Sequence, residues 1–397
     1  MKHFTSLLAC FLMFVGTVTA QEAATTDYAT AEGVVPALST SGGIQYAYYL
    51  RNVKFPQSFL GVTNTAGASG TTTVTTDVSN AVKVAIEKTS NGFTMYTLLA
   101  DGTRSGNKIK SGESAPMVWV DNKSTDIYQW RVEYVDADGA FTFYSTKRSK
   151  YLWAPAATNT QNKDVTSTLM YGSFSSYVQH MGWKFIPANE AAEQARDLTL
   201  TVQNTGDAVH GNVATFSASY PVSLPDGYTA YSAQYKETEN CIEMTPLTGS
   251  VIPANTGVLV KGAAGTPAMK PSLLDAGEAI SGNAFVSVGD VAHTFGSEDT
   301  QIYLLGKQDG TMCFRLMKTD GTQTIAAHKA YIDLSAQDIP DESLSSLRFN
   351  FGDAATSIVN VEGVHQASVP CYDLSGRRVA QPAHGFYIQN GKKIIVK

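Results

Sequence analysis

Cysteine is scarce in this chain of 397 residues, with four in all and only Cys241, Cys313 and Cys371 outside the N-terminal apolar run. Their odd number and wide spacing exclude a disulfide framework and the paired spacing of a zinc site. One disulfide, between Cys241 and Cys313, stays possible, with buried free thiols as the alternative. Stability must therefore come from hydrophobic cores, which the 43% of hydrophobic residues can supply.

Positive charge is also in short supply. The chain has 29 Lys and Arg against 35 Asp and Glu, a net charge of −6, and the basic residues form no cluster on its body. A protein that binds nucleic acid needs a positive surface to meet the phosphates. Nucleic acid is therefore excluded as a partner.

The usual catalytic motifs are absent as well. The sequence contains no Gly-x-Ser-x-Gly elbow, no His-Glu-x-x-His, no Walker loop and no Gly-x-Gly-x-x-Gly. No histidine after residue 20 lies at metal-ligand spacing from another His or Cys. We therefore predict no metal site and no cofactor.

Two arrangements could still do chemistry. Cys313 and His328 could meet across a hairpin, but Cys313 alternates with Phe314 in an apolar segment that is typical of a buried thiol. The carboxylates of Asp136-Ala137-Asp138-Gly139 are close, but this pattern is typical of a hairpin turn. We predict no catalytic residue; a hydrolase such as a glycosidase, with its carboxylates on separate strands, remains the less favoured alternative.

The N-terminus carries the one long apolar run. Lys2 and His3 precede apolar residues 4–18, and Val18-Thr19-Ala20 supplies the small residues that signal peptidase requires. A run of about 15 residues is short for a membrane span. We predict a signal peptide over residues 1–20, export of the protein, and no transmembrane segment after cleavage. A lipoprotein site ending at Cys10 is the minor alternative.

Helical periodicity is nearly absent, whereas Thr, Val, Tyr, Phe and turn signals are frequent, which predicts an all-β protein. The exception is Asn189 to Arg196, a short helix that Asn189 could cap. We expect the chain to divide, in order, into a signal peptide (1–20), a flexible leader (21–43), a β-trefoil-like domain (44–188), a linker (189–197), a β-sandwich (198–352) and a C-terminal sorting-like tail (353–397).

An internal repeat supports the trefoil. Gly92-Phe93-Thr94-Met95-Tyr96 is matched 48 residues later by Ala140-Phe141-Thr142-Phe143-Tyr144. The preceding segments agree at the same offset, and Trp183-Lys184-Phe185 provides a third copy of them. Three units of about 45 residues, each made of a few short strands, predict a β-trefoil.

At these residues the chain resembles the ricin-type trefoils of secreted bacterial proteins. The match runs from Tyr48-Tyr49-Leu50-Arg51-Asn52, through Trp130-Arg131-Val132, to Tyr151-Leu152. The resemblance implies a lectin-like, carbohydrate-binding domain. The family's Gln-x-Trp signature is absent because Gln129 lies directly beside Trp130, and this departure puts the family's sugar pockets in question.

A shallow sugar site needs an aromatic face for the ring and a few polar groups for its hydroxyls. Two segments near the ends of repeats have this composition: Trp119 with Asp121 and Asn122, and Tyr151 and Trp153 with Asn159. The alternative is that these aromatic residues belong to the trefoil core. Trp130 and Trp183 occupy equivalent repeat positions and are expected in the core.

The last segments resemble known exported proteins. Residues 198–352 are similar to the β-sandwich that precedes a sorting tail in multidomain proteins of the Bacteroidota. The end of the chain is similar to a type IX secretion sorting domain, a match that depends on the following residues: Tyr372, Asp373, Gly376, Arg377, Arg378, Gly385, Tyr387, Lys392 and Lys397. The resemblance implies delivery by export machinery to the cell surface or the medium; a structural hairpin is the alternative.

Three functions remain open at this point. The favoured one is a non-catalytic surface binding protein whose trefoil-like domain recognises a glycan or a host or surface protein. The second is a structural or adhesive component that makes only protein contacts, which the missing Gln-x-Trp favours. The third is the hydrolase named above.

Overall fold

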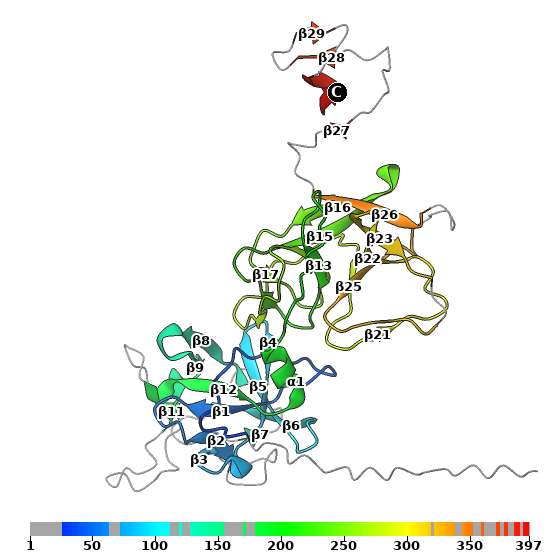
Figure 1. The fold of residues 1–397 in the computed structure, drawn as a ribbon. Coiled ribbons are helices and arrows are strands. Elements are labelled where there is room, and N and C mark those ends of the chain that lie inside the picture. Colours follow the sequence, from blue (N-terminus) through cyan, green and yellow to red (C-terminus); the bar gives the residue numbers. More distant parts are fainter. Residues whose placement is uncertain are drawn as a thin grey trace, which may run out of the picture.

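The computed structural model confirms an all-β protein (Figure 1). It describes residues 26–62, 72–111, 119–120, 128–154, 170–171, 179–318, 321–337, 344–351, 359–360, 371–373, 377–379, 385–389 and 392–396. The expected signal peptide and several site residues lie outside these ranges; the residues concerned are Asp121, Asn122, Asn159, Gly376 and Lys397. Among the described residues no helix has the length and apolar character needed to cross a membrane.

The first domain is a β-trefoil whose barrel is formed by six strands: β1 (Tyr48–Asn52), β4 (Val84–Thr89), β5 (Gly92–Leu98), β8 (Arg131–Val135), β9 (Ala140–Ser145) and β12 (Trp183–Pro187). Antiparallel pairing runs from β1 through β4, β5, β8, β9 and β12 and returns to β1. The β5–β8 step is the bridge between Phe93 and Trp130. The ring is therefore closed, and closure removes exposed strand edges.

Each of the three repeats adds one further pair of strands. These pairs are β2 (Phe59–Val62) with β3 (Thr72–Thr75), β6 (Arg104–Ile109) with β7 (Trp119–Val120), and β10 (Lys150–Leu152) with β11 (Met170–Tyr171). β1, β5 and β9 each pair with the first strand of the hairpin that follows in the sequence. This threefold pattern is the structural counterpart of the internal repeat.

Equivalent bonds connect the hairpins to the barrel in all three repeats. The Val82 amide donates to the Leu60 carbonyl, while the indole nitrogens of two tryptophans donate to the equivalent hairpin carbonyls. All six residues are fully buried: Leu60, Val82, Ile109, Trp130, Leu152 and Trp183. The core placement expected for Trp130 and Trp183 is thus confirmed.

Residues expected to be a flexible leader instead pack on the trefoil. Val34 forms a bridge with Phe185, the Ala37 amide donates to Tyr48 Oη at 2.8 Å, and the Ser39 amide donates to the Ile86 carbonyl. Ala37 is fully buried. The short apolar stretch around Ala37 is stabilised by leaving water. The small and polar residues around this stretch led to the prediction of a flexible leader.

The linker is also part of the packed structure. Helix α1 (Glu190–Arg196) begins after Asn189, whose side chain accepts from the Ala192 amide at 3.0 Å, so the predicted helix and its cap are confirmed. The same side chain bonds to the main chain of Gln45 and Ala47. Ala192 and Ala195 are buried in a hydrophobic core that includes residues of both domains.

The second domain contains a nine-stranded sheet with the order β13-β18-β15-β16-β26-β23-β22-β25-β20. Its strands are β13 (Val213–Phe216), β15 (Thr229–Lys236), β16 (Cys241–Pro246), β18 (Val258–Lys261), β20 (Phe285–Ser287), β22 (Ile302–Gln308), β23 (Thr311–Leu316), β25 (Ala330–Asp333) and β26 (Ser346–Phe351). β16 and β26 are parallel, and all other neighbouring strands in this sheet are antiparallel.

The two halves of this sheet share one core and so form the sandwich. Residues of β13 and β18 lie in the same buried cluster as residues of β20, β22 and β25. Two small sheets complete the domain; they consist of β14 (Val222–Ser223), β17 (Val251–Ile252) and β19 (Lys270–Pro271), and of β21 (His293–Thr294) with β24 (Thr324–Ile325). Cys241 and Cys313 are both free, so the possible disulfide does not form.

The C-terminal segment is also β-structured, with strand order β27-β31-β30-β28-β29. The strands are β27 (Val359–Asn360), β28 (Cys371–Tyr372), β29 (Arg378–Val379), β30 (Gly385–Gln389) and β31 (Lys392–Val396). Arg377 bonds to Asp373 through its amide and its guanidinium, at 2.9 and 3.1 Å. Two of the residues that carry the sorting resemblance therefore close one turn.

Candidate functional site

Tyr151 and Trp153 lie at the end of β10, in the third repeat of the trefoil. Leu152 between them is fully buried, and its carbonyl accepts from the Trp183 indole at 3.2 Å. Because successive side chains of a strand point to opposite faces, Tyr151 and Trp153 point away from this core. Both are partly exposed. The structure thus brings together two of the residues proposed to bind a ligand.

An aromatic pair extends this face. Tyr151 is the register partner of Tyr144 on β9, and their ring centroids are 4.8 Å apart. The guanidinium of Arg131, on β8, lies 4.6 Å from the Tyr144 ring. In the sequence, Tyr144 belongs to the internal repeat and Arg131 to the segment that resembles ricin-type trefoils, and neither was predicted to bind a ligand. Tyr144 on β9, the strand next to β10, and Arg131 on β8, which pairs with β9, are neighbours of the predicted ligand face.

Trp153 is held by a second set of contacts. Its indole stacks on the His180 ring, with centroids 4.4 Å apart and planes 18° apart, and Phe55 packs edge-on against the same imidazole at 5.0 Å. His180 Nδ1 lies 2.9 Å from the Ala154 carbonyl. Buried Asn52 donates to the carbonyl of His180 at 2.9 Å. Contacts among three segments of the chain, around Phe55, Trp153 and His180, therefore fix the orientation of Trp153.

We call the set Phe55, Tyr144, Tyr151, Trp153 and His180 the β10 aromatic site. An ordered aromatic surface of this kind offers an apolar face at little cost in conformational entropy. The other predicted cluster is in a different repeat. Trp119 is in β7, paired with Ile109 of β6, and its polar neighbours lie outside the described residues.

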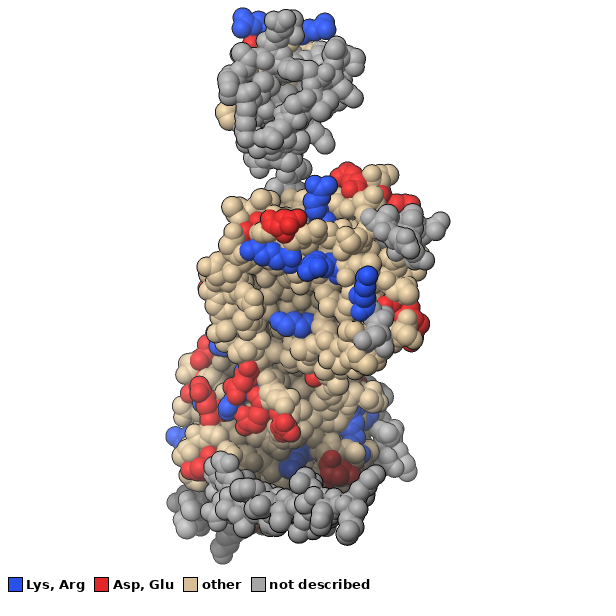
Figure 2. Space-filling view, turned by 45° about the vertical axis from the view of Figure 1, so that its right-hand side comes forward, with Lys and Arg blue, Asp and Glu red and all other residues tan. Residues whose placement is uncertain are grey.

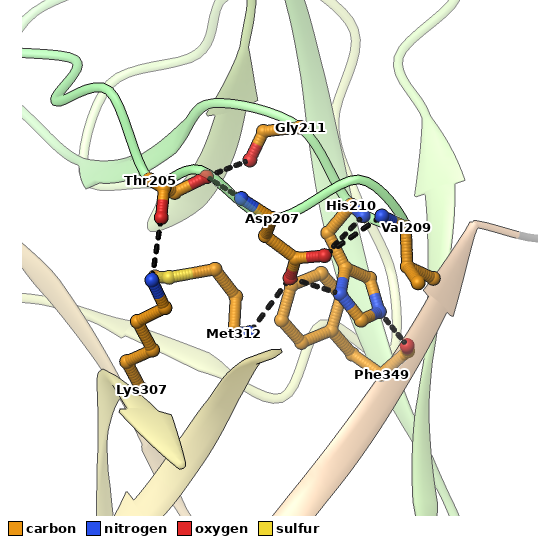
Figure 3. A network of polar contacts seen from close by, with 8 residues as sticks. All are labelled: Thr205, Asp207, Val209, His210, Gly211, Lys307, Met312 and Phe349. Carbon is orange, nitrogen blue, oxygen red and sulfur yellow. Dashed lines mark hydrogen bonds and ion pairs between the residues drawn. The ribbon is translucent and has the colours of Figure 1, made fainter. Parts of the chain in front are cut away.

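The second domain contains a buried aspartate–histidine pair that the sequence did not reveal (Figure 3). Asp207 Oδ2 lies 2.8 Å from His210 Nδ1 and accepts from the Met312 amide at 2.7 Å, while His210 Nε2 lies 2.9 Å from the Phe349 carbonyl. A neutral imidazole has one N–H, and both ring nitrogens here face acceptors. Both ring nitrogens of His210 thus have a partner within the domain.

The surroundings of Asp207 favour its charged form. Burial alone raises the pKa of this carboxyl, but the hydrogen bonds from the Met312, Val209 and His210 amides and from the His210 ring outweigh burial and hold the pKa well below its usual range. Asp207 is 7% and His210 6% exposed. The pair has no open face for a substrate, so its role is to join the 205–212 loop to β23 and β26.

A second polar cluster connects the two domains. Tyr46 of the trefoil hydrogen-bonds to Ser219 and Asp290 of the second domain, and the Ser219 hydroxyl also bonds to Asp290. His328 Nδ1 lies 3.4 Å from the other carboxylate oxygen. In a hydrolytic triad the base would face the serine hydroxyl. Here the carboxylate occupies that position, so this arrangement does not activate Ser219.

Cys313 and His328 likewise form no dyad. Cys313 is 4% exposed, and burial raises the pKa of its thiol, which disfavours the reactive thiolate. His328 faces the Ser217 carbonyl at 3.3 Å and stacks on Phe216. Asp136 to Asp138 form the predicted turn, a 3-10 helix that ends at left-handed Gly139. Within the described ranges, no group of three or more His, Cys, Asp or Glu side chains could hold a metal ion.

Comparison with known proteins yields only weak similarities. No protein-family model matches the chain, and neither does any curated protein. Among solved structures, the lysenin pore is 12% identical over 40% of this chain and 49% of its own, with a TM-score of 0.29. The Polyporus squamosus lectin bound to a human-type influenza-binding epitope is 12% identical over 38% and 50%, with a TM-score of 0.27.

A mosquitocidal holotoxin is 13% identical over 72% of this chain and 34% of its own, with a TM-score of 0.30. The chain thus spans about half the length of the lysenin and lectin chains and a third of the toxin. TM-scores near 0.3 are too low to carry an argument about fold or ligand. The chain is assigned to no family, and its trefoil is identified by its own strand pairing.

Proposed function

We propose that this protein is a non-catalytic binding protein that recognises carbohydrate through the β10 aromatic site. The observation that carries the proposal is the placement of Tyr151 and Trp153 on the outer side of β10, partly exposed and fixed by neighbouring rings. An aromatic ring covers the apolar face of a sugar, and nearby polar groups select its hydroxyls.

The chemistry next to these rings fits such a ligand. Arg131 is about half exposed, and beyond its contact with Tyr144 it pairs with Glu133 at 2.8 Å. Both charged side chains are available to hydroxyl groups because a surface ion pair of this type is weak. Asn159, outside the described residues, is proposed as a further polar contact because it follows Trp153 closely in the sequence.

Binding to a glycan array, followed by calorimetry with the best ligand, tests the proposal. Trp153→Ala and Tyr151→Ala are expected to weaken binding about tenfold or more, since each removes an aromatic face. Tyr134→Ala is the matched control, because Tyr134 is a 42% exposed tyrosine of the same domain on the neighbouring hairpin. No glycan bound at millimolar protein, or equal loss in the control, would refute the proposal.

Trp119, Asp121 and Asn122 are proposed as a second binding segment in the second repeat. Trp119→Ala in the same assay assigns their contribution. If both Trp119→Ala and Trp153→Ala left binding of every array ligand unchanged, a purely structural or adhesive role would be favoured instead. Pull-down of surface proteins by the intact chain, unaffected by free sugars, would support that role.

We further propose that the protein is exported and displayed at the cell surface, with the N-terminal segment as signal and the C-terminal segment as sorting tail. The Asp373–Arg377 turn supports a defined shape for the tail. Deletion of residues 372–397 is expected to keep the protein from the surface, measured by surface labelling of intact cells. Unchanged surface labelling would show that the segment is only a structural hairpin.

A further inference from the structure

A cavity with ligand-binding character lies in the second domain, away from the β10 aromatic site. It opens beside β13, between that strand and β22, and extends to the β24–β25 connection, with a volume of ≈ 580 Å³. Sites for small molecules commonly have volumes of about 300–1,000 Å³. Figure 2 shows that Lys and Arg side chains are spread across the middle of this domain.

The cavity is lined by a lysine, Lys329, for which the described residues provide no anionic partner. Lys329 is partly buried, and among the described residues its ammonium group makes no hydrogen bond or ion pair. Burial lowers the pKa of Lys329, and no carboxylate opposes this effect. A partly buried charge without a partner is costly. An anion in the cavity would remove that cost.

The main chain on either side of Lys329 is held firmly. The Lys329 carbonyl accepts from the Ser217 hydroxyl at 2.6 Å and from the Val288 amide at 3.1 Å. The preceding residue, His328, has a φ of 59°, and its amide donates to the Gly289 carbonyl at 2.7 Å. Left-handed backbone at a residue other than glycine persists only where its surroundings impose it. The ammonium group is thus attached to an ordered segment.

Further polar groups face the same cavity. Thr215 of β13 is 7% exposed and lines it, and among the described residues no group hydrogen-bonds to its hydroxyl. Gln203, at the rim, is exposed and likewise has no side-chain hydrogen bond there. Lys307 donates to the Thr205 carbonyl at 2.6 Å, which leaves two of its three N–H groups for a ligand.

Part of the cavity lining is apolar. Leu304 and Ile325 line the cavity and pack at the edge of a buried cluster around Phe295 and Tyr331. The cavity therefore combines one partly buried cation, a hydroxyl, an amide and an aliphatic wall. A carboxylate or sulfate with several hydroxyls on a compact ring satisfies all four features, whereas a bare inorganic anion would leave the aliphatic wall and the amide without contacts.

We propose that this cavity, the β13 cavity, binds an anionic sugar unit whose acidic group pairs with Lys329 and whose hydroxyls bond to Thr215 and Gln203. The ring of the sugar lies against Leu304 and Ile325. The site is separate from the β10 aromatic site in both sequence and structure. The protein then has two carbohydrate sites of different charge preference.

Calorimetric titration of the whole chain with glucuronate, N-acetylneuraminate and galactose 6-sulfate tests this proposal, with neutral galactose and inorganic sulfate as comparators. At least one acidic sugar is expected to bind at least about tenfold more tightly than galactose and than sulfate, since a charge-assisted hydrogen bond contributes about 1.5–3 kcal/mol. Equal affinity for inorganic sulfate would overturn the sugar assignment, and no binding of any acidic sugar would overturn the site.

Variants separate this site from the other one. Lys329→Met is expected to lower acidic-sugar affinity at least about tenfold and Gln203→Ala a few-fold, while Trp153→Ala leaves it unchanged. Lys318→Met, an exposed lysine of the same domain outside the cavity, is the matched control. Because Gln203 is exposed, its variant folds even if Lys329→Met does not. Loss of acidic-sugar binding in Trp153→Ala, with Lys329→Met unaffected, would assign the anion to the β10 aromatic site and refute the proposal.

Discussion

The trefoil and the second domain close their β-sheets and form their cores in different ways. The trefoil closes a six-strand ring from three similar units, and its largest buried side chains are aromatic. The second domain joins its halves through the parallel pair β16–β26, in which Cys241 lies opposite Arg348. It also buries the Asp207–His210 pair near this junction.

The difference shows what each kind of contact contributes. Large buried side chains at equivalent positions of the repeats stabilise a closed barrel chiefly through the apolar surface that they bury. Two strands about 100 residues apart, such as β16 and β26, can pair in alternative ways during folding. The buried Asp207 carboxylate favours the native pairing, because any arrangement that buries it without its partners costs free energy. We therefore expect the stability of the trefoil to depend mainly on the volume of its buried side chains, and the stability of the second domain to depend more on specific polar contacts.

The largest expected effect is on the trefoil core. Trp183→Ala removes a fully buried indole and its bond to the Leu152 carbonyl, and should lower the free energy of unfolding by about 3–5 kcal/mol. Chemical denaturation followed by circular dichroism measures this loss. Trp153→Ala is the control, because Trp153 is partly exposed, and should cost less than about 1.5 kcal/mol. Equal losses would show that Trp153 belongs to the core.

The trefoil was predictable because its signal is periodic. Spacing of 48 residues aligned Val82 with Trp130, and both positions are buried contacts to the hairpins. The packing of the leader was missed because its strand bridge, between Val34 and Phe185, joins segments 151 residues apart. No local sequence pattern indicates such a contact. The core that the two domains share likewise joins residues far apart in the sequence, so no local pattern indicates it.

The candidate sites were predictable only in part. Alternation around Leu152 places Tyr151 and Trp153 on one side, but the stacking of His180 on Trp153 depends on the fold. His210 has no histidine or cysteine near it in the sequence. Asp207 lies three residues earlier, which is a spacing at which two side chains can pair locally. The other partner of His210, the Phe349 carbonyl, is 139 residues away, and no sequence signal identifies it.

The second domain should be most sensitive at Asp207. Asp207→Ala leaves the buried His210 ring and the Met312 amide without their partner, and should lower the free energy of unfolding by about 3 kcal/mol. Denaturant titration of the whole chain gives the value. Asp226→Ala, which changes an exposed turn aspartate of the same domain, should change stability by less than about 0.5 kcal/mol. A neutral result for Asp207→Ala would remove the contrast between the two domains.

Acid should weaken the second domain through the same carboxylate. The pKa of Asp207 is depressed in the folded state, so its contribution is complete above the unfolded value of about 3.9 and is lost as the pH falls from there toward the folded pKa. The loss should reach about 2 kcal/mol between pH 5 and pH 2. Denaturation at a series of pH values tests this, and the slope should be shallower in Asp207→Ala. The same slope in both proteins would assign acid sensitivity to other carboxylates.

The smallest expected effect concerns the contact between the two regions. Tyr46→Phe removes the trefoil's hydrogen bonds to Ser219 and Asp290 but keeps its ring contact with Tyr220, at 5.2 Å. Asp290 retains the Ser219 hydroxyl and amide as donors, so the loss should be about 1 kcal/mol. Calorimetry should show the two domains unfolding less cooperatively.

Tyr49→Phe is the matched control for this change, because Tyr49 is a buried tyrosine three residues further along, in β1, and packs in a different cluster, around Phe59. It should leave the cooperativity of unfolding unchanged. If Tyr46→Phe does the same, the apolar residues of the shared core, such as Ala218 and Tyr220, hold the domains together without help from the polar cluster. The interface between the domains would then be stabilised by buried apolar side chains, as the trefoil is, rather than by specific hydrogen bonds, as we expect for the second domain.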